Sequence, residues 1–169
     1  MRLGLIIAAA AFMADQISKR IMLDVFRPPG VTETPFYSPR LIDVLPVFNL
    51  RLAWNTGISF SLFSDSGEVG RVLLIAGQLT IVGVLLWWLR SAQTVWMKAG
   101  IGLIVGGALG NILDRLIYGA VVDFLDFHAA GAHFPTFNLA DTAISVGVGC
   151  WLLDAYLTRH QDGVTPETK

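Results

Sequence analysis

Four long apolar segments dominate the pattern of hydrophobic and polar positions along the chain. A membrane-spanning helix needs about 20 mostly apolar residues, and each segment approaches that length. The second segment carries no charge from Val72 to Leu89 and ends in Trp87 and Trp88, an aromatic pair typical of a membrane–water interface. The pattern therefore predicts four transmembrane helices, at about 3–23, 69–89, 95–118 and 138–157.

The connections between these segments have different patterns. Four prolines between 28 and 39 argue against helix in the first long connection, 24–68. Later in that connection, from Phe48 to Asn55, large apolar residues alternate with mainly polar ones, which predicts a strand with one buried face. We expect this β element to lie outside the membrane, against its surface. The connection 121–135 mixes apolar and acidic residues, and we expect an interfacial loop or short helix there.

These elements make one domain that covers 1–169. The predicted fold class is mainly α and integral to the membrane: four transmembrane helices, a small extramembrane β element and the interfacial connection. The polar C-terminal tail, 158–169, is expected to be disordered.

Composition agrees with lipid as the surrounding solvent. Hydrophobic residues make up 54% of the 169 residues and charged residues 15%, whereas soluble domains carry about 25% charged residues. The net charge of −1 and the lack of a basic cluster argue against nucleic acid as a partner. A single cysteine, Cys150, excludes an internal disulfide. Three scattered histidines lack zinc-ligand spacing, so we expect no metal site.

The first apolar segment has a second interpretation. Arg2 followed by apolar residues to Met13 resembles a cleavable secretory signal. Asp15 and Lys19 favour a retained helix, because they lie four residues apart on one helix face and can form an ion pair. Four retained helices place both chain ends on the same side of the membrane. Counting Arg and Lys does not decide which side, since the result depends on whether residues at helix ends are included.

Ionisable residues within a membrane are costly, so each is a candidate for function. In the predicted topology, the ionisable residues and several amides come together near one membrane face. One side of the third helix carries three of them at i, i+3 and i+4, namely Asn111, Asp114 and Arg115. The set near this face is Asp15, Lys19, Asn55, Asn111, Asp114, Arg115, Asp123, Asn138 and Asp141.

Two carboxylates of this set could form an aspartyl dyad. In such a dyad, like charges about 3 Å apart share one proton. One aspartate accepts a proton from the attacking water, and the other, protonated, polarises the scissile carbonyl. Asp141 opens the fourth helix, and the connection before it carries Asp123 and Asp126. Spacing alone leaves open which of these two is the partner of Asp141.

Structural roles also fit these residues. Asp141 can cap the fourth helix, Asp114 and Arg115 can form a structural charge pair, and the segment 55–57 can be a turn after the strand. Small residues four apart in the third helix predict close packing against its neighbours; they are Gly102, Gly106 and Gly110.

Taken together, five short segments resemble the lipoprotein signal peptidase family, also called signal peptidase II or aspartyl peptidase family A8. Each segment is weak evidence alone, but five in this order, at these positions relative to four helices, form a specific pattern over almost the whole chain. Mild departures occur at Trp54 and at Ile58-Ser59. The five segments are Asp15–Lys19, Asn55–Phe60, Gly106–Arg115, Val121–Phe124 and Phe137–Asp141.

The resemblance implies an intramembrane aspartyl endopeptidase. Members of this family remove the signal peptide from diacylglyceryl-modified bacterial prolipoproteins and cut immediately before the lipidated cysteine. The motif implies that Asp123 and Asp141 are the catalytic pair, which selects Asp123 over Asp126. The residues that it implies bind substrate or support the dyad are Asp15, Lys19, Asn55, Gly57, Asn111, Asp114, Arg115, Asn138 and Ala140.

The resemblance also implies a cellular setting. It places the chain in the bacterial inner membrane, with both termini cytoplasmic and with the β element and active site toward the periplasm. The implied partners are prolipoprotein substrates, membrane lipid and inhibitors of the globomycin type, without a cofactor, and we expect a monomer. The alternative function is a small proton- or ion-coupled transporter with Asp15, Asp114 and Asp141 as a relay, which predicts carboxylates spread through the membrane depth.

Overall fold

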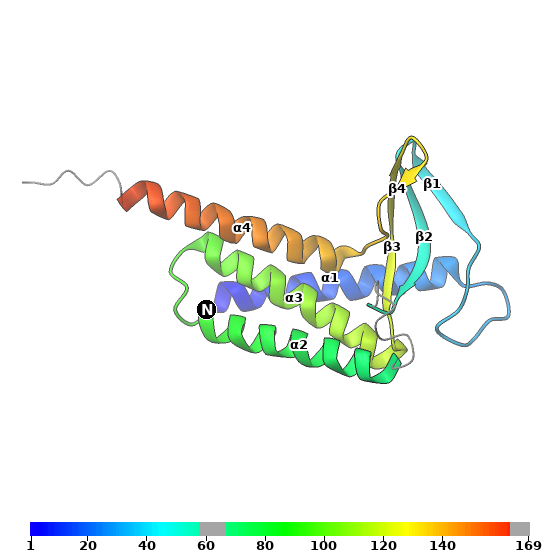
Figure 1. The fold of residues 1–169 in the computed structure, drawn as a ribbon, viewed down its shortest axis with the longest axis horizontal. Coiled ribbons are helices and arrows are strands. Elements are labelled where there is room, and N and C mark those ends of the chain that lie inside the picture. Colours follow the sequence, from blue (N-terminus) through cyan, green and yellow to red (C-terminus); the bar gives the residue numbers. More distant parts are fainter. Residues whose placement is uncertain (58–66, 163–169) are drawn as a thin grey trace, which may run out of the picture.

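The computed structural model describes residues 1–57 and 67–162, and within them four long helices lie side by side with a small sheet across one end (Figure 1). Two parts of the predictions lie outside the described residues: the Ile58–Phe60 part of the second family segment, and the tail from 163 onward. The helices are α1 (Arg2–Phe26), α2 (Gly67–Trp88), α3 (Val95–Tyr118) and α4 (Leu139–Asp162).

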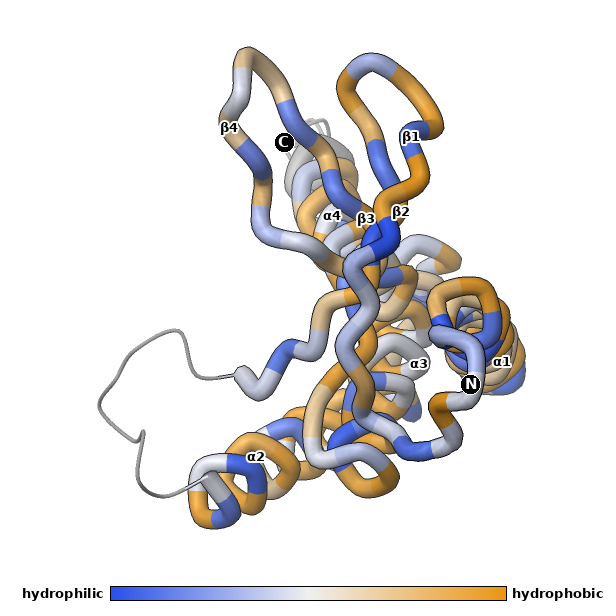
Figure 2. The backbone as a smooth tube through the Cα atoms, turned by 90° about the vertical axis from the view of Figure 1, so that its right-hand side faces the viewer, coloured by the Kyte–Doolittle hydropathy of each residue, from blue (hydrophilic) through white to orange (hydrophobic). Residues whose placement is uncertain are grey.

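The four predicted helical segments are all helices. The bounds of α3 coincide with the predicted 95–118, whereas α4 continues past the predicted end at 157 to Asp162, where a disordered tail was expected. Two of the helices, α2 and α3, are long and apolar enough to cross a membrane by length and composition. Hydrophobic residues make up much of α2 in Figure 2. The count of four membrane spans stays a prediction.

Helix α3 is the centre of the helical part, because it packs against α1 on one side and α4 on another. Glycines make both approaches close. A Cβ added at Gly106 would overlap the Ala8 carbonyl and lie 2.8 Å from the Ala11 Cβ, and one added at Gly107 would lie 2.5 Å from the Ala140 carbonyl oxygen of α4. The close packing predicted for the small residues of α3 is thus confirmed.

The small sheet is antiparallel, with the strand order β1-β2-β3-β4. The predicted strand Phe48–Asn55 is β2, with the same bounds. Its neighbour β1 (Leu41–Leu45) lies in the connection where no second strand was expected. Figure 1 shows the strands running across the helix direction at the end of the bundle that is far from the chain's N-terminus. The β element is thereby placed beside the first turn of α4.

We expected an interfacial loop or short helix in the connection 121–135. It instead forms two strands, β3 (Val121–Ala129) and β4 (Ala132–His133). Because β3 pairs with β2 from Phe48↔Phe127 to Asn55↔Val121, its backbone groups are satisfied by a ladder. Successive side chains of a strand point to opposite faces. Consecutive residues of β3 are buried, so this strand is buried on both faces for most of its length, and its acidic residues lie among the apolar ones.

A prediction follows from the glycine contacts of α3. Gly106→Ala should lower the free energy of unfolding by about 1–3 kcal/mol, because the added methyl group overlaps the backbone of α1 and forces the helices apart. Thermal unfolding in detergent measures the effect. The matched control is Gly77→Ala in α2, where nothing lies within 4 Å of the added atom; it should leave stability unchanged or raise it by up to about 1 kcal/mol. Equal effects of the two substitutions would contradict the packing argument.

Candidate active site

Asp141 lies in the first turn of α4, where it forms a reciprocal cap with Asn138. The Asp141 backbone N–H donates to Asn138 Oδ1 at 2.9 Å, and the Asn138 N–H donates to Asp141 Oδ2 at 3.3 Å. This is the capping-box arrangement, which satisfies two backbone donors that a helix N-terminus leaves free. The capping role considered for Asp141 is therefore present, and it fixes the carboxylate at the end of the bundle next to the sheet.

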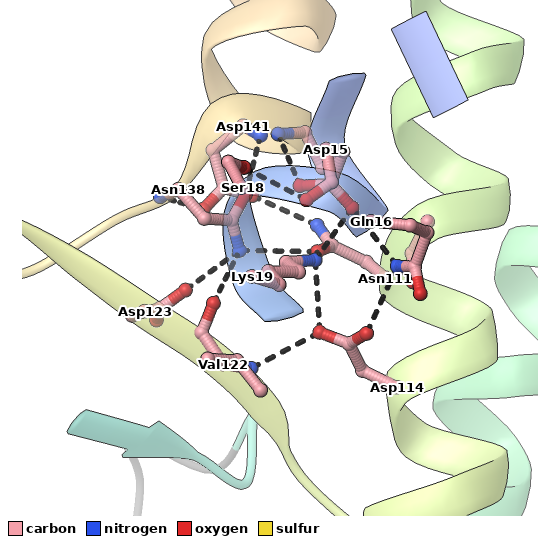
Figure 3. A network of polar contacts seen from close by, with 12 residues as sticks. Asp15, Gln16, Ser18, Lys19, Asn111, Asp114, Val122, Asp123, Asn138 and Asp141 are labelled. Carbon is pink, nitrogen blue, oxygen red and sulfur yellow. Dashed lines mark hydrogen bonds and ion pairs between the residues drawn. The ribbon is translucent and has the colours of Figure 1, made fainter. Parts of the chain in front are cut away.

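Two buried amides connect Asp141 to Asp123 (Figure 3). Asn138 Nδ2 donates to Asp123 Oδ1 at 2.7 Å, and Asn111 Nδ2 donates to Asp141 Oδ1 at 2.9 Å. The two amides also contact each other, because Asn138 Nδ2 lies 3.2 Å from Asn111 Oδ1. Asp141 thus receives an amide donor from Asn111 of α3. Asp123 receives one from Asn138, which precedes α4, and the side chain of Asn55 at the end of β2 also hydrogen-bonds to it.

Asp123 differs from Asp141 in its surroundings. The Asp123 side chain is 1% exposed, whereas Asp141 is half-buried. Burial raises the pKa of Asp123 to about 7, and the neighbouring negative charge of Asp141 acts in the same direction. Among the described residues, Asp123 Oδ2 has no hydrogen-bond partner. Near neutral pH this carboxyl group can therefore hold a proton close to a second carboxyl group.

Strand geometry separates Asp123 from Asp126. The two residues are three apart in β3, so their side chains point to opposite faces of the sheet. Asp123 faces Asn138 and the start of α4. Asp126 is also buried, but its carboxylate contacts His133, whose Nδ1 lies 2.9 Å from Asp126 Oδ1. The structure therefore brings Asp123, and not Asp126, to Asp141.

A buried charge network lies beside the two aspartates (Figure 3). Lys19 Nζ lies 2.8 Å from Asp15 Oδ2 and 2.8 Å from Asp114 Oδ2, and it donates to Asn111 Oδ1 at 3.0 Å. The predicted Asp15–Lys19 ion pair is confirmed. The close ion pair of Asp114 is with Lys19 of α1, because adjacent residues of a helix point in different directions. The charges of Asp114 and Arg115 attract each other at longer range.

Asp15 and Asp114 also accept hydrogen bonds from the backbone N–H groups directly before Asp141 and Asp123. The Ala140 N–H donates to Asp15 Oδ1 at 2.9 Å, and the Val122 N–H donates to Asp114 Oδ2 at 3.1 Å. Ala140 is fully buried. Ala140 therefore contributes to the site through its backbone N–H, and its small side chain fits a fully buried position.

Arg115 of α3 lies close enough to the two aspartates for the charges of Asp141 and Asp123 to act on its guanidinium group, and it also contacts α2. Its Nη1 donates to Gln78 Oε1 of α2 at 3.1 Å and to the Asn111 carbonyl oxygen at 3.3 Å. Gln78 is not among the site residues that the sequence predicts. Neither is Gln16, whose Nε2 donates to Asp114 Oδ1 at 3.1 Å. A signal for both was available, since each is an amide inside a predominantly apolar helix.

Asn55 and Gly57 lie where β2 ends. The Gly57 N–H donates to Asn55 Oδ1 at 2.8 Å, and Gly57 has a φ of +79°, so the predicted turn is confirmed. A side chain at Gly57 would be strained by that φ and would collide with Leu74 of α2. Asn55 pairs with Val121 across the ladder, which places it on the same sheet face as Asp123.

All the predicted site residues thus lie at one end of the helix bundle, around the edge of the sheet. Within residues 1–57 and 67–162 there is no group of three or more His, Cys, Asp or Glu side chains that could hold a metal ion. The chemistry that this arrangement can perform is proton transfer between two carboxyl groups in a mostly buried setting.

Comparison with known proteins assigns this geometry to a family. The family described as signal peptidase (SPase) II matches residues 7–157. The chain belongs to the signal peptidase II family. Among the relatives of this family, the lipoprotein signal peptidase of Nitrobacter hamburgensis is 43% identical over 161 residues, which cover 93% of each protein. That of Aeromonas hydrophila is 40% identical over 164 residues, covering 95% of this chain and 92% of its own.

Solved structures agree with the assignment to signal peptidase II. A bacterial membrane enzyme solved by the in meso method at 2.3 Å resolution superimposes with a TM-score of 0.76 and 27% identity, covering 100% of this chain and 96% of its own. A second such enzyme, at 1.9 Å resolution, gives a TM-score of 0.74 and 26% identity. As a member of the signal peptidase II family, the chain is a peptidase and a bacterial membrane protein.

Proposed function

We propose that the chain is an aspartic endopeptidase that releases the signal peptide of diacylglyceryl-modified prolipoproteins by cutting just before the lipidated cysteine. Membership of the signal peptidase II family supplies the coarser part, removal of signal peptides from prolipoproteins. The observation that carries the aspartic mechanism is the pair of buried amides, Asn111 and Asn138, which hold the carboxylates of Asp141 and Asp123 at a common site.

In the proposed mechanism, the two aspartates have different roles. Asp123 carries the proton, since its burial raises its pKa to about 7, and it donates a hydrogen bond to the scissile carbonyl oxygen. Asp141 is half-buried and accepts a proton from the water that attacks the carbonyl carbon. The tetrahedral intermediate then collapses with proton transfer to the leaving nitrogen. The reaction needs two carboxyl groups that share one proton, and it needs no cofactor.

The proposed setting is the bacterial inner membrane, with four spanning helices. The helices have 22 to 25 residues, or about 33–38 Å at 1.5 Å per residue, against a hydrocarbon thickness of about 30 Å. Helices α1 and α4 carry more charged residues than α2 and α3. Large apolar side chains nevertheless face outward from them, such as Ile6 at 65% and Leu152 at 66% exposed. Lipid around the bundle accounts for such exposure.

The proposed orientation has both ends of the helical part on one side of the membrane. The start of α1 and the end of α4 lie at the same end of the bundle, opposite to the sheet (Figure 1). We place these ends in the cytoplasm and the sheet at the periplasmic surface. The apolar signal peptide and the acyl chains of a prolipoprotein partition into the bilayer, so the bond to be cut lies at the membrane surface, next to Asp123 and Asp141.

Further parts of the proposal concern partners. Inhibitors of the globomycin type should bind between the two aspartates, lipid should surround the helices, and the chain should act as a monomer. The alternative of an ion-coupled transporter is not favoured. A relay needs carboxylates through the membrane depth, whereas Asp15, Asp114 and Asp141 gather at one end of the bundle.

The dyad gives a direct mutational prediction. Asp123→Asn and Asp141→Asn should each lower kcat by at least about 10³-fold, because each removes one of the two groups that transfer a proton. The measurement is cleavage of a diacylglyceryl-modified prolipoprotein by purified protein in detergent. Thermal unfolding verifies that each variant is folded.

Asp126→Asn is the matched control, because it removes a buried carboxylate from the same strand, on the opposite sheet face. It should keep kcat within about threefold of the wild type while lowering stability, since Asp126 loses its charged contact with His133. Wild-type cleavage by Asp123→Asn or Asp141→Asn would refute the dyad. An inactive but folded Asp126→Asn would refute the assignment of roles within β3.

A second prediction concerns pH. Asp123 must be protonated in the proposed mechanism, and its pKa is about 7. The group therefore supports catalysis below this pH and loses its proton above it, so kcat/KM should fall about tenfold per pH unit as pH rises beyond about 7. Initial rates between pH 5 and pH 10 at constant ionic strength test this. A rate that stays constant up to pH 9 would show that Asp123 does not act as the acid.

A further inference from the structure

Two carboxylates outside the dyad each accept a hydrogen bond from the backbone N–H directly before a dyad residue. Asp15 accepts from Ala140, which precedes Asp141, and Asp114 accepts from Val122, which precedes Asp123. The two contacts come from different helices, α1 and α3, and reach different elements, α4 and β3. Figure 3 shows Asp15 and Asp114 on either side of Lys19.

Lys19 joins the two contacts into one chain. Its Nζ lies 2.8 Å from an oxygen of each carboxylate, so the sequence of contacts is backbone N–H, carboxylate, ammonium, carboxylate, backbone N–H. Charge-assisted hydrogen bonds are shorter and about twice as strong as neutral ones. The chain of contacts therefore connects the backbone next to Asp141 to the backbone next to Asp123 through three side chains with little freedom to move.

Several observations separate these three residues from substrate chemistry. Asp15, Asp114 and Lys19 are between 0% and 2% exposed, so substrate cannot reach them. Within the described residues, none of the three forms a hydrogen bond or ion pair with a dyad carboxylate, and Lys19 acts on Asp123 through its charge alone, which lowers the pKa of Asp123. The fit is also specific, because a Cβ added at Gly110 of α3 would overlap the Asp15 carboxylate. Gln16 adds a further contact, since its Nε2 donates to both carboxylates at 3.1 Å.

We propose that the Asp15–Lys19–Asp114 bridge is a positioning device that sets the separation of Asp123 and Asp141. This inference rests on the proposed function, because a separation matters only if the two aspartates act together. Two carboxyl groups share one proton only at a short separation, so the segments that carry them must be held at a fixed distance. The bridge holds both segments by their backbones while leaving the dyad side chains free to share a proton.

The test is the kinetics of Asp114→Asn, which keeps an oxygen for the Val122 N–H but loses the charge that attracts Lys19. We expect kcat to fall about 10–100-fold, because a displacement of about 1 Å at reacting groups costs up to about 10²-fold. KM should stay within about threefold. The descending limb of the pH profile should move to lower pH, because a more distant Asp141 favours the proton on Asp123 less strongly.

Asp15→Asn is the second variant and should behave in the same way, because it acts on the other end of the bridge. It keeps the proposal testable if Asp114→Asn does not fold. Since both variants act through Lys19, the double variant should lose less activity than the product of the single losses. The matched control is Asp154→Asn at the opposite end of α4, where the carboxylate accepts a hydrogen bond from Thr94 Oγ1; its kcat and pH profile should not change.

Four results would overturn the proposal. They are a wild-type kcat in folded Asp114→Asn and Asp15→Asn, a loss of kcat with an unchanged pH profile, an effect on KM alone, and multiplicative effects in the double variant. Asp123→Asn, measured in the same series, separates this failure from that of the dyad. If Asp123→Asn is inactive and the bridge variants match the wild type, the dyad stands and the bridge is refuted. An active Asp123→Asn refutes both.

Discussion

The arrangement at the end of the bundle depends on one buried cation between two buried anions. Lys19 Nζ contacts Asp15 and Asp114 at 2.8 Å each, in a position almost closed to water. Removing an ion from water without a partner costs several kcal/mol, so each of these groups requires the others. Lys19 lies on α1 and Asp114 on α3, and this requirement fixes the relative position of the two helices at the level where β3 and α4 begin.

Short side chains can make these contacts only because the helix backbones lie close together. Glycines of α3 admit the backbone of α1 at Gly106 and that of α4 at Gly107. Aspartate and asparagine then reach across the interface, and Asn111 of α3 contacts both Lys19 of α1 and Asp141 of α4. The polar contacts at the end of the bundle thus depend on the close packing of the helices, since a wider spacing would leave buried polar groups without partners.

The sequence predicted the elements with strong local patterns. The bounds of α3 and of the strand Phe48–Asn55 follow from apolar length and from alternation. The strand β3 was missed because it is buried on both faces for most of its length, so it shows no alternation. Its partner β2 is also more than 60 residues away along the chain. The choice of Asp123 over Asp126 came from the family motif. The backbone bonds to Asp15 and Asp114 have no sequence signal, because any residue except proline supplies an N–H.

The most direct measurement for the central claim is an experimental structure with a peptide inhibitor whose hydroxyl group mimics the tetrahedral intermediate, since such a group is bound by the residues that act in the transition state. The account predicts that this hydroxyl lies within hydrogen-bond distance, about 2.5–3.2 Å, of the carboxylates of both Asp123 and Asp141, with Asn111 and Asn138 still bonded to them. A hydroxyl that contacts only one of these aspartates, or that binds beside Asp126, would contradict the account.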